Sequence, residues 1–152
     1  MVLFFVMKSR IYAWSIKITR AILPWRLGAK HRSDVHFRGW FSTTIHGRKI
    51  EPFNFNTELE TSLFWTKSIA EVETSLLCFT ELAKISTTIL GVGANTGIFV
   101  VAASSVNKNA TTFAIEPSYT NFMGLKANGT RNGLPVSCLN LAVTSENKLG
   151  KL

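Results

Sequence analysis

Apolar side chains in residues 1–23 recur every three or four positions, so they would line one face of a helix. Basic residues limit the longest uninterrupted apolar run to seven residues, well below the ~18 needed to span a bilayer. Three interpretations stay open: a helix packed on the folded domain, an interfacial membrane helix, or an acid-poor organelle transit peptide. The apolar positions are Phe4, Met7, Ile11, Trp14, Ile18 and Ile22.

The spacing of apolar residues shortens after a linker that contains Pro24 and Gly28 and extends to about residue 33. Val35 alternates with polar neighbours, and Gly47-Arg48 separates this stretch from a second apolar group, which predicts a small β-hairpin within residues 34–57. From residue 58 the spacing returns to three and four. This return predicts a helix that leads into the following glycine-rich turn.

After this helix, predicted strands and helices alternate in the order β, α, β, α, β. The apolar run before Gly91 predicts a buried strand, and residues 98–106 predict a helix packed against a sheet. Residues 111–115 predict a second strand, and Pro117 favours the start of a second helix, which Asn128-Gly129 or Asn132-Gly133 can end. Residues 135–141 predict a third strand. This alternation predicts an α/β fold with a parallel sheet and right-handed crossovers.

The turn between the first strand and its helix is the main candidate for chemistry. Gly91, Gly93 and Gly97 give the spacing G-x-G-x-x-x-G, and glycine allows a ligand to approach the backbone closely. Glu116 ends the next strand, where a carboxylate can accept hydrogen bonds from the two hydroxyls of a ribose. The dinucleotide fingerprint G-x-G-x-x-G is one residue shorter, and no Gly-Lys-Ser/Thr of a phosphate loop follows. The turn therefore favours a nucleoside cofactor other than a dinucleotide.

Several segments together resemble the FkbM family of class I S-adenosylmethionine-dependent methyltransferases. The similarity covers roughly residues 58–152 and follows the order and spacing of the family's motifs. The residues that carry it are Gly93-Ala94-Asn95-Thr96-Gly97, Ala114-Ile115-Glu116-Pro117, Asn121-Phe122, Leu125, Asn128, Asn132-Gly133-Leu134 and Leu141-Ala142-Val143, with Trp65 and Glu73 upstream.

The resemblance implies a Rossmann-like fold that binds S-adenosyl-L-methionine. Gly93, Ala94, Asn95 and Gly97 would line the methionine and ribose end of the cofactor, and Glu116 would hold the ribose hydroxyls. The segment from Asn140 to Ala142, after the third strand, would lie near the adenine. The implied reaction is O-methylation of a sugar or small-metabolite hydroxyl, and no catalytic base can be named from the sequence.

Two features depart from the family pattern. The family usually has Asp where this chain has Gly91, which predicts weaker cofactor binding. Family members also continue with a fourth strand that carries an acidic motif, so the similarity covers the cofactor-binding half, with the first three strands of the sheet. The expected organisation is a basic extension over residues 1–33, a hairpin region over 34–57 and a partial methyltransferase domain over 58–152.

The distribution of charge separates the N-terminal third from the rest of the chain. Residues 1–50 carry ten basic residues and one acid, a net charge of +9, whereas residues 51–152 carry seven basic and eight acidic residues, a net charge of −1. A nucleic-acid-binding domain usually spreads its basic residues over the folded part, so this function is disfavoured. The basic segment instead favours an anionic membrane surface, which residues 1–26 would contact in a cytoplasmic protein, or an import receptor of an organelle-targeted protein.

Cysteine and histidine positions add little chemistry. Cys78 and Cys138 lie sixty residues apart, which favours reduced structural thiols, and no histidine has the spacing of a metal ligand. Two hypotheses compete with the methyltransferase. One is an NAD-dependent oxidoreductase fragment, because Glu116 also suits an NAD ribose, and the other is a non-catalytic protein that binds a membrane or partner through its basic segment.

Overall fold

A computed structural model describes Ile18 and residues 38–66 and 73–145 of the chain. The predicted N-terminal helix and its boundary near residue 33 lie outside these residues, apart from Ile18. None of the helices among the described residues is long and apolar enough to cross a bilayer.

The larger sheet contains three parallel strands, β5 (Thr88–Val92), β6 (Thr111–Ile115) and β7 (Val136–Leu139), in the order β5-β6-β7. Helix α5 (Ile98–Val106) connects the first two strands and α6 (Tyr119–Arg131) connects the last two. In the register, Gly91 lies beside Ala114 and Ala114 beside Cys138. The predicted βαβαβ order is confirmed, and the arrangement is that of one half of a Rossmann-like fold.

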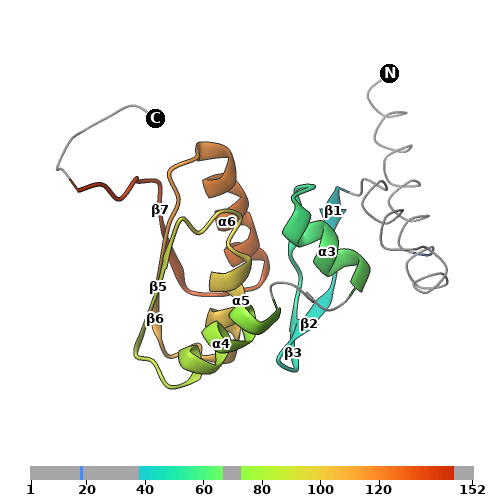
Figure 1. Cartoon of the computed structure of the whole chain (residues 1–152), viewed down its shortest axis with the longest axis horizontal. Coiled ribbons are helices and arrows are strands. Elements are labelled where there is room, and N and C mark those ends of the chain that lie inside the picture. The colour runs from blue at the N-terminus through green and yellow to red at the C-terminus, as the bar shows by residue number, and fades with distance from the viewer. Residues whose placement is uncertain (1–17, 19–37, 67–72, 146–152) are drawn as a thin grey trace.

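The helices cover one face of this sheet (Figure 1). Side chains alternate along each strand, so Ile89 and Ala114 are buried toward the helices while their neighbours point away. Helix α5 lies in the centre and is buried on most of its surface, as its nearly continuous apolar sequence predicts. The opposite face carries exposed apolar side chains, namely Leu90, Val92, Phe113 and Leu139.

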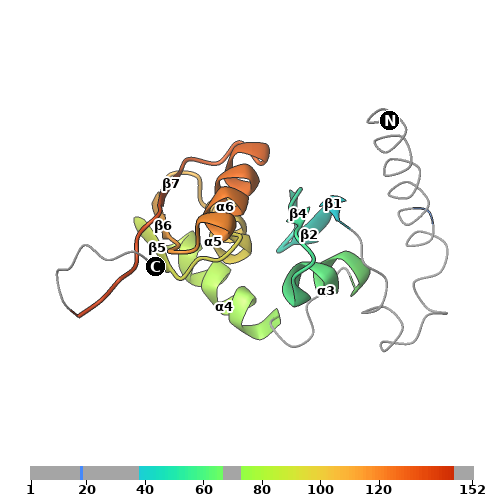
Figure 2. The same cartoon turned by 90° about the horizontal axis from the view of Figure 1, so that it is seen from above.

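The N-terminal part forms a second layer on the side of the helices away from the sheet (Figures 1 and 2). Strands β2 (Thr43–Ile45) and β3 (Arg48–Ile50) pair antiparallel around the turn at His46 and Gly47, which confirms the predicted hairpin. Strands β1 (Gly39–Trp40) and β4 (Phe53–Asn54) form a second antiparallel pair. The predicted region therefore contains two strand pairs, because the chain continues past Pro52 into β4.

The single helix expected from residue 58 onward is two helices, α3 (Glu58–Thr66) and α4 (Glu73–Lys84). Leu63 of α3 and Leu76 of α4 belong to the same core cluster. An apolar stripe with helical spacing can thus continue over two helices that pack on one core. Spacing alone does not show where one helix ends and the next begins.

Two asparagines, Asn128 of α6 and Asn132 at its C-cap, join the two layers. The side-chain oxygen of Asn128 accepts the N–H of Phe53 (2.8 Å), and its amide nitrogen donates to the carbonyl of Thr96 (2.8 Å). One turn later, Asn132 accepts the N–H of Glu51 (2.7 Å) and donates to the Glu51 carbonyl (3.2 Å). These side chains satisfy main-chain groups at the end of the hairpin, much as another strand would.

These bonds explain which predicted stop ends α6. Asn128 is fully buried and uses its side chain for tertiary hydrogen bonds, and the helix continues past it. The helix ends at Arg131 with Asn132 as its C-cap, and Gly133 just beyond is left-handed (φ 60°). The third strand, β7, is shorter than the predicted 135–141, and residues 140–145 follow it without regular structure.

Replacing Asn128 with alanine should destabilise the fold strongly. Asn128→Ala leaves the Phe53 N–H and the Thr96 carbonyl without partners in the interior, and we expect the free energy of unfolding to fall by about 2 to 5 kcal/mol. Urea denaturation measures this change. Asn109→Ala, at an exposed loop position, is the control and should change it by less than about 0.5 kcal/mol. Equal effects at the two positions would contradict this account of the interface between the layers.

Candidate functional site

The turn from Gly93 to Gly97 follows β5 directly and has an unusual backbone. Gly93 (φ 66°), Asn95 (φ 50°) and Gly97 (φ 88°) all lie in the left-handed region. Glycine adopts this region without a steric penalty, and asparagine is among the few other residues that tolerate it. The sequence thus provides a suitable residue at each left-handed position, and the chain reverses sharply before α5 begins at Ile98.

Hydrogen bonds fix this turn to the end of the neighbouring strand. The N–H of Ala94 donates to the carbonyl of Ile115 (2.9 Å), the last residue of β6. The N–H of Asn95 donates to Glu116 Oε2 (2.7 Å), and the N–H of Gly97 closes the turn on the Ala94 carbonyl (2.8 Å). The short contact to a carboxylate is of the strong, charge-assisted kind.

Glu116 is the central polar residue of the site. Its side chain joins the turn to the start of α6, because Oε1 accepts the N–H of Ser118 (2.9 Å) while Oε2 accepts that of Asn95. Glu116 is only 5% exposed, so its carboxylate is held in one place. Each carboxylate oxygen can accept a second hydrogen bond, which leaves two acceptor positions for a ligand.

Asn140, the residue directly after β7, adds a third segment to the hydrogen-bonded group around Glu116. Its amide nitrogen donates to the carbonyls of Glu116 (2.8 Å) and Pro117 (2.9 Å), so the segment after β7 is tied to the segment after β6. Ala142 is exposed two residues farther along and stays outside this hydrogen-bonded group. The ends of three parallel strands thus meet at one edge of the sheet, where ligands of open α/β folds bind.

The structure brings together six of the seven predicted cofactor residues: Gly93, Ala94, Asn95, Gly97, Glu116 and Asn140. Ala142 is the exception. Gly93 and Asn95 are exposed at the turn, Ala94 is half-buried, and Gly97 is buried where α5 begins. These six residues therefore lie together at the end of the sheet, with Gly93 and Asn95 exposed and with Gly97 and Glu116 buried.

The sequence pattern does not single out Thr96, Glu60 and Asn128 as site residues, although they support the turn from its other side. Glu60 accepts the Thr96 hydroxyl, and Asn128 donates to the Thr96 carbonyl. One signal was available, because Thr57 and Glu60 have the T-x-x-E spacing of a helix capping box. That motif predicts a local role for Glu60, whereas one of its oxygens bonds a residue 36 positions away.

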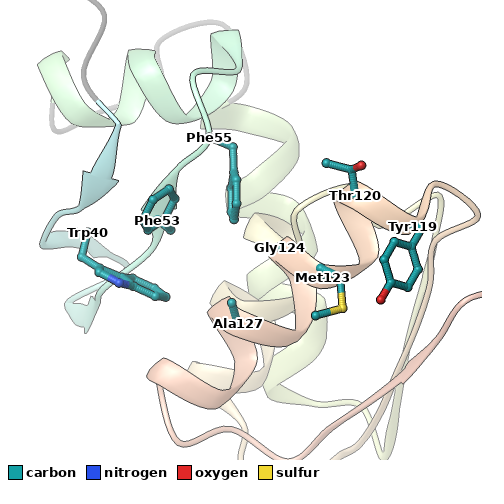
Figure 3. Close-up of a pocket in the computed structure, with 8 residues that line it drawn as sticks. All are labelled: Trp40, Phe53, Phe55, Tyr119, Thr120, Met123, Gly124 and Ala127. Carbon is teal, nitrogen blue, oxygen red and sulfur yellow. The ribbon is translucent and has the colours of Figure 1, made fainter. Parts of the chain in front are cut away.

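A separate pocket of about 450 Å³ lies between the N-terminal layer and α6 (Figure 3). Its walls are aromatic and apolar, and none of the predicted cofactor residues lines it. It meets the turn through Gly124, since a Cβ on Gly124 would lie 2.9 Å from the Phe55 ring and 3.4 Å from the Thr96 methyl group. Its lining residues are Trp40, Phe53, Phe55, Tyr119, Thr120, Met123, Gly124 and Ala127.

The cysteines take no part in the site. Cys78 is exposed on α4 and Cys138 is half-buried on β7, and both are free thiols. Burial raises the pKa of the Cys138 thiol, which keeps it protonated and unreactive at neutral pH. Within the described residues, no group of three histidine, cysteine or acidic side chains is placed to hold a metal ion.

Among the comparisons with known proteins, only the comparison of structures finds similar proteins. No protein-family model matches the chain, and no curated protein matches it. The SAM-dependent methyltransferase from Agrobacterium tumefaciens is 11% identical with a TM-score of 0.49, over 70% of this chain and 33% of its own. TYW2 from M. jannaschii, solved in complex with AdoMet, is 18% identical with a TM-score of 0.45, over 71% and 45%. This chain thus spans less than half the length of either protein.

Adding a methyl group at Gly97 should damage the turn more than adding one at another left-handed glycine. A Cβ on Gly97 would lie 2.4 Å from the Leu125 side chain, whereas a Cβ on Gly133 (φ 60°) would meet no atom within 4 Å. We expect Gly97→Ala to reduce the free energy of unfolding by about 2 to 4 kcal/mol and Gly133→Ala by about 1 kcal/mol. Chemical denaturation compares the two variants, and similar losses would show that Leu125 does not constrain the turn.

Proposed function

We propose that the edge of the sheet at residues 93–97 and 116 binds S-adenosyl-L-methionine, and that the chain is the cofactor-binding part of a methyltransferase. The observation that carries the proposal is the buried Glu116 carboxylate, fixed by the Asn95 N–H on one oxygen and the Ser118 N–H on the other. The two acceptor positions left on this carboxylate suit the two hydroxyls of a ribose.

The length of the turn favours this cofactor over a dinucleotide. The dinucleotide fingerprint has two residues between its last two glycines, and this chain has three, Ala94, Asn95 and Thr96. The added length accommodates Asn95 in a left-handed conformation, with its N–H directed at Glu116. The turn and the ribose acceptor are thereby connected directly, and the methionine end of the cofactor would lie over Gly93 and Asn95.

The proposed reaction is methyl transfer of the FkbM type to a hydroxyl of a sugar or a small metabolite. When bound, S-adenosyl-L-methionine would supply an activated methyl group for the acceptor oxygen, with S-adenosylhomocysteine and the hydroxyl proton as the other products. The residues of this chain would bind and orient the cofactor. Positioning of the reacting groups can supply a large part of the rate enhancement of a group transfer.

Calorimetric titration with S-adenosylhomocysteine and, separately, with NAD tests the cofactor. We expect heat with S-adenosylhomocysteine, and we expect Glu116→Gln to weaken its binding by about 10- to 100-fold, because a charged hydrogen-bond acceptor is lost. Glu58→Gln, at an exposed position of α3, is the matched control and should bind as the wild type does. Heat with NAD alone would overturn the proposal and favour the oxidoreductase.

The structure also predicts how the acid missing at Gly91 could be restored. A Cβ on Gly91 would lie 2.5 Å from a methyl group of Val100, which is buried in α5, so Gly91→Asp alone should lower the free energy of unfolding by about 1 to 3 kcal/mol. Val100→Ala removes the methyl group that the new side chain would meet. We expect this pair to tighten S-adenosylhomocysteine binding about tenfold over Val100→Ala alone. Equal affinities in calorimetry would show that an acid at position 91 does not contribute here.

A further inference from the structure

Glu60 is a fully buried carboxylate that is hydrogen-bonded to the proposed cofactor site at Thr96. It lies in the first turn of α3, and Oε2 accepts the N–H of Phe55 (2.9 Å) and the hydroxyl of Thr57 (2.9 Å). Oε1 accepts the hydroxyl of Thr96 in a short hydrogen bond. Among the described residues no ion pair of Glu60 is recorded, so three hydrogen bonds offset the cost of burying it.

Thr96 connects this carboxylate to the turn. It is 3% exposed and stands between Asn95 and Gly97, both of which are left-handed. Its hydroxyl is held by Glu60, and its carbonyl accepts the Asn128 amide (2.8 Å). The hydroxyl and the carbonyl of Thr96 are therefore fixed from the helical side, while Glu116 fixes the N–H of Asn95 from the sheet side.

We infer that Glu60 is a positioning residue of the cofactor turn, acting through the Thr96 hydroxyl. This inference rests on the proposed function for its effect on affinity, though not for its effect on the turn itself. Glu60 and Glu116 hold adjacent residues of one turn from opposite sides. Together they keep Asn95 in the conformation that presents the exposed side of the turn to a ligand.

A role restricted to helix capping would not need the second oxygen. The Thr57 hydroxyl and the Phe55 N–H both bond Oε2, and the N–H of Glu60 lies 3.4 Å from the Thr57 hydroxyl oxygen, so the local contacts are complete without Oε1. Oε1 is directed instead at a residue 36 positions away in the sequence. The part of Glu60 that reaches the turn is thus separate from the part that begins α3.

The test compares Thr96→Val, which removes the hydroxyl at almost constant shape, with Thr96→Ser, which keeps it. We expect Thr96→Val to weaken S-adenosylhomocysteine binding about tenfold in calorimetry, and to speed amide exchange at Asn95 and Gly97 about tenfold in the free protein. Thr96→Ser should stay within about threefold of the wild type in both measurements. Leu76→Ala, at a core position of α4 outside the turn, controls for general destabilisation.

The outcomes separate the two proposals. If Thr96→Val destabilises the protein as Leu76→Ala does, yet leaves turn exchange and affinity unchanged, Glu60 has only a structural role and the inference is overturned. If the wild type binds no S-adenosylhomocysteine, the proposed function fails. The exchange rates in the free protein then decide the inference alone, with faster exchange in Thr96→Val, and not in Thr96→Ser, supporting it.

Discussion

The hydrogen bond from the Asn95 N–H to the Glu116 carboxylate is the contact on which the arrangement of the site depends. Asn95 is one of the few described residues other than glycine with a positive φ, and such a conformation persists only where its surroundings hold it. The carboxylate does so while also accepting the Ser118 N–H, so one buried side chain fixes both the turn and the start of α6. A single acid therefore ties together the segments that follow β5 and β6.

The N-terminal layer supports the same turn from the opposite direction. Asn128 bridges the Phe53 N–H and the Thr96 carbonyl, and Glu60 bridges the Phe55 N–H and the Thr96 hydroxyl. Both bridges link strand β4 or the residue that follows it to the middle of the turn. The small strand pairs are thus part of the site's support as well as a cover for the helices.

The sequence was sufficient for features that depend on neighbouring residues. Alternation between buried strands and helices, and the spacing of Gly93, Gly97 and Glu116, follow local rules, and the structure has the βαβαβ order at those positions. The contacts of Glu60 and Asn128 could not be predicted, because they join residues 36 and 75 positions apart. Their local patterns, a capping box and a possible helix stop, indicated nearer partners. The capping contacts do form on Oε2 of Glu60, and its Oε1 adds a tertiary hydrogen bond, whereas at Asn128 the tertiary hydrogen bonds form and the helix does not stop.

Helix α6 also connects the turn to the aromatic pocket. Gly124 has no side chain at the point where α6 passes between the Phe55 ring and the Thr96 methyl group, and any larger residue would push these apart. Phe55 forms a wall of the pocket with its ring, while its N–H bonds Glu60. Phe55 therefore borders the pocket and also lies beside both neighbours of Thr96, Glu60 through a hydrogen bond and Gly124 through close packing. The pocket and the turn therefore share one packed support.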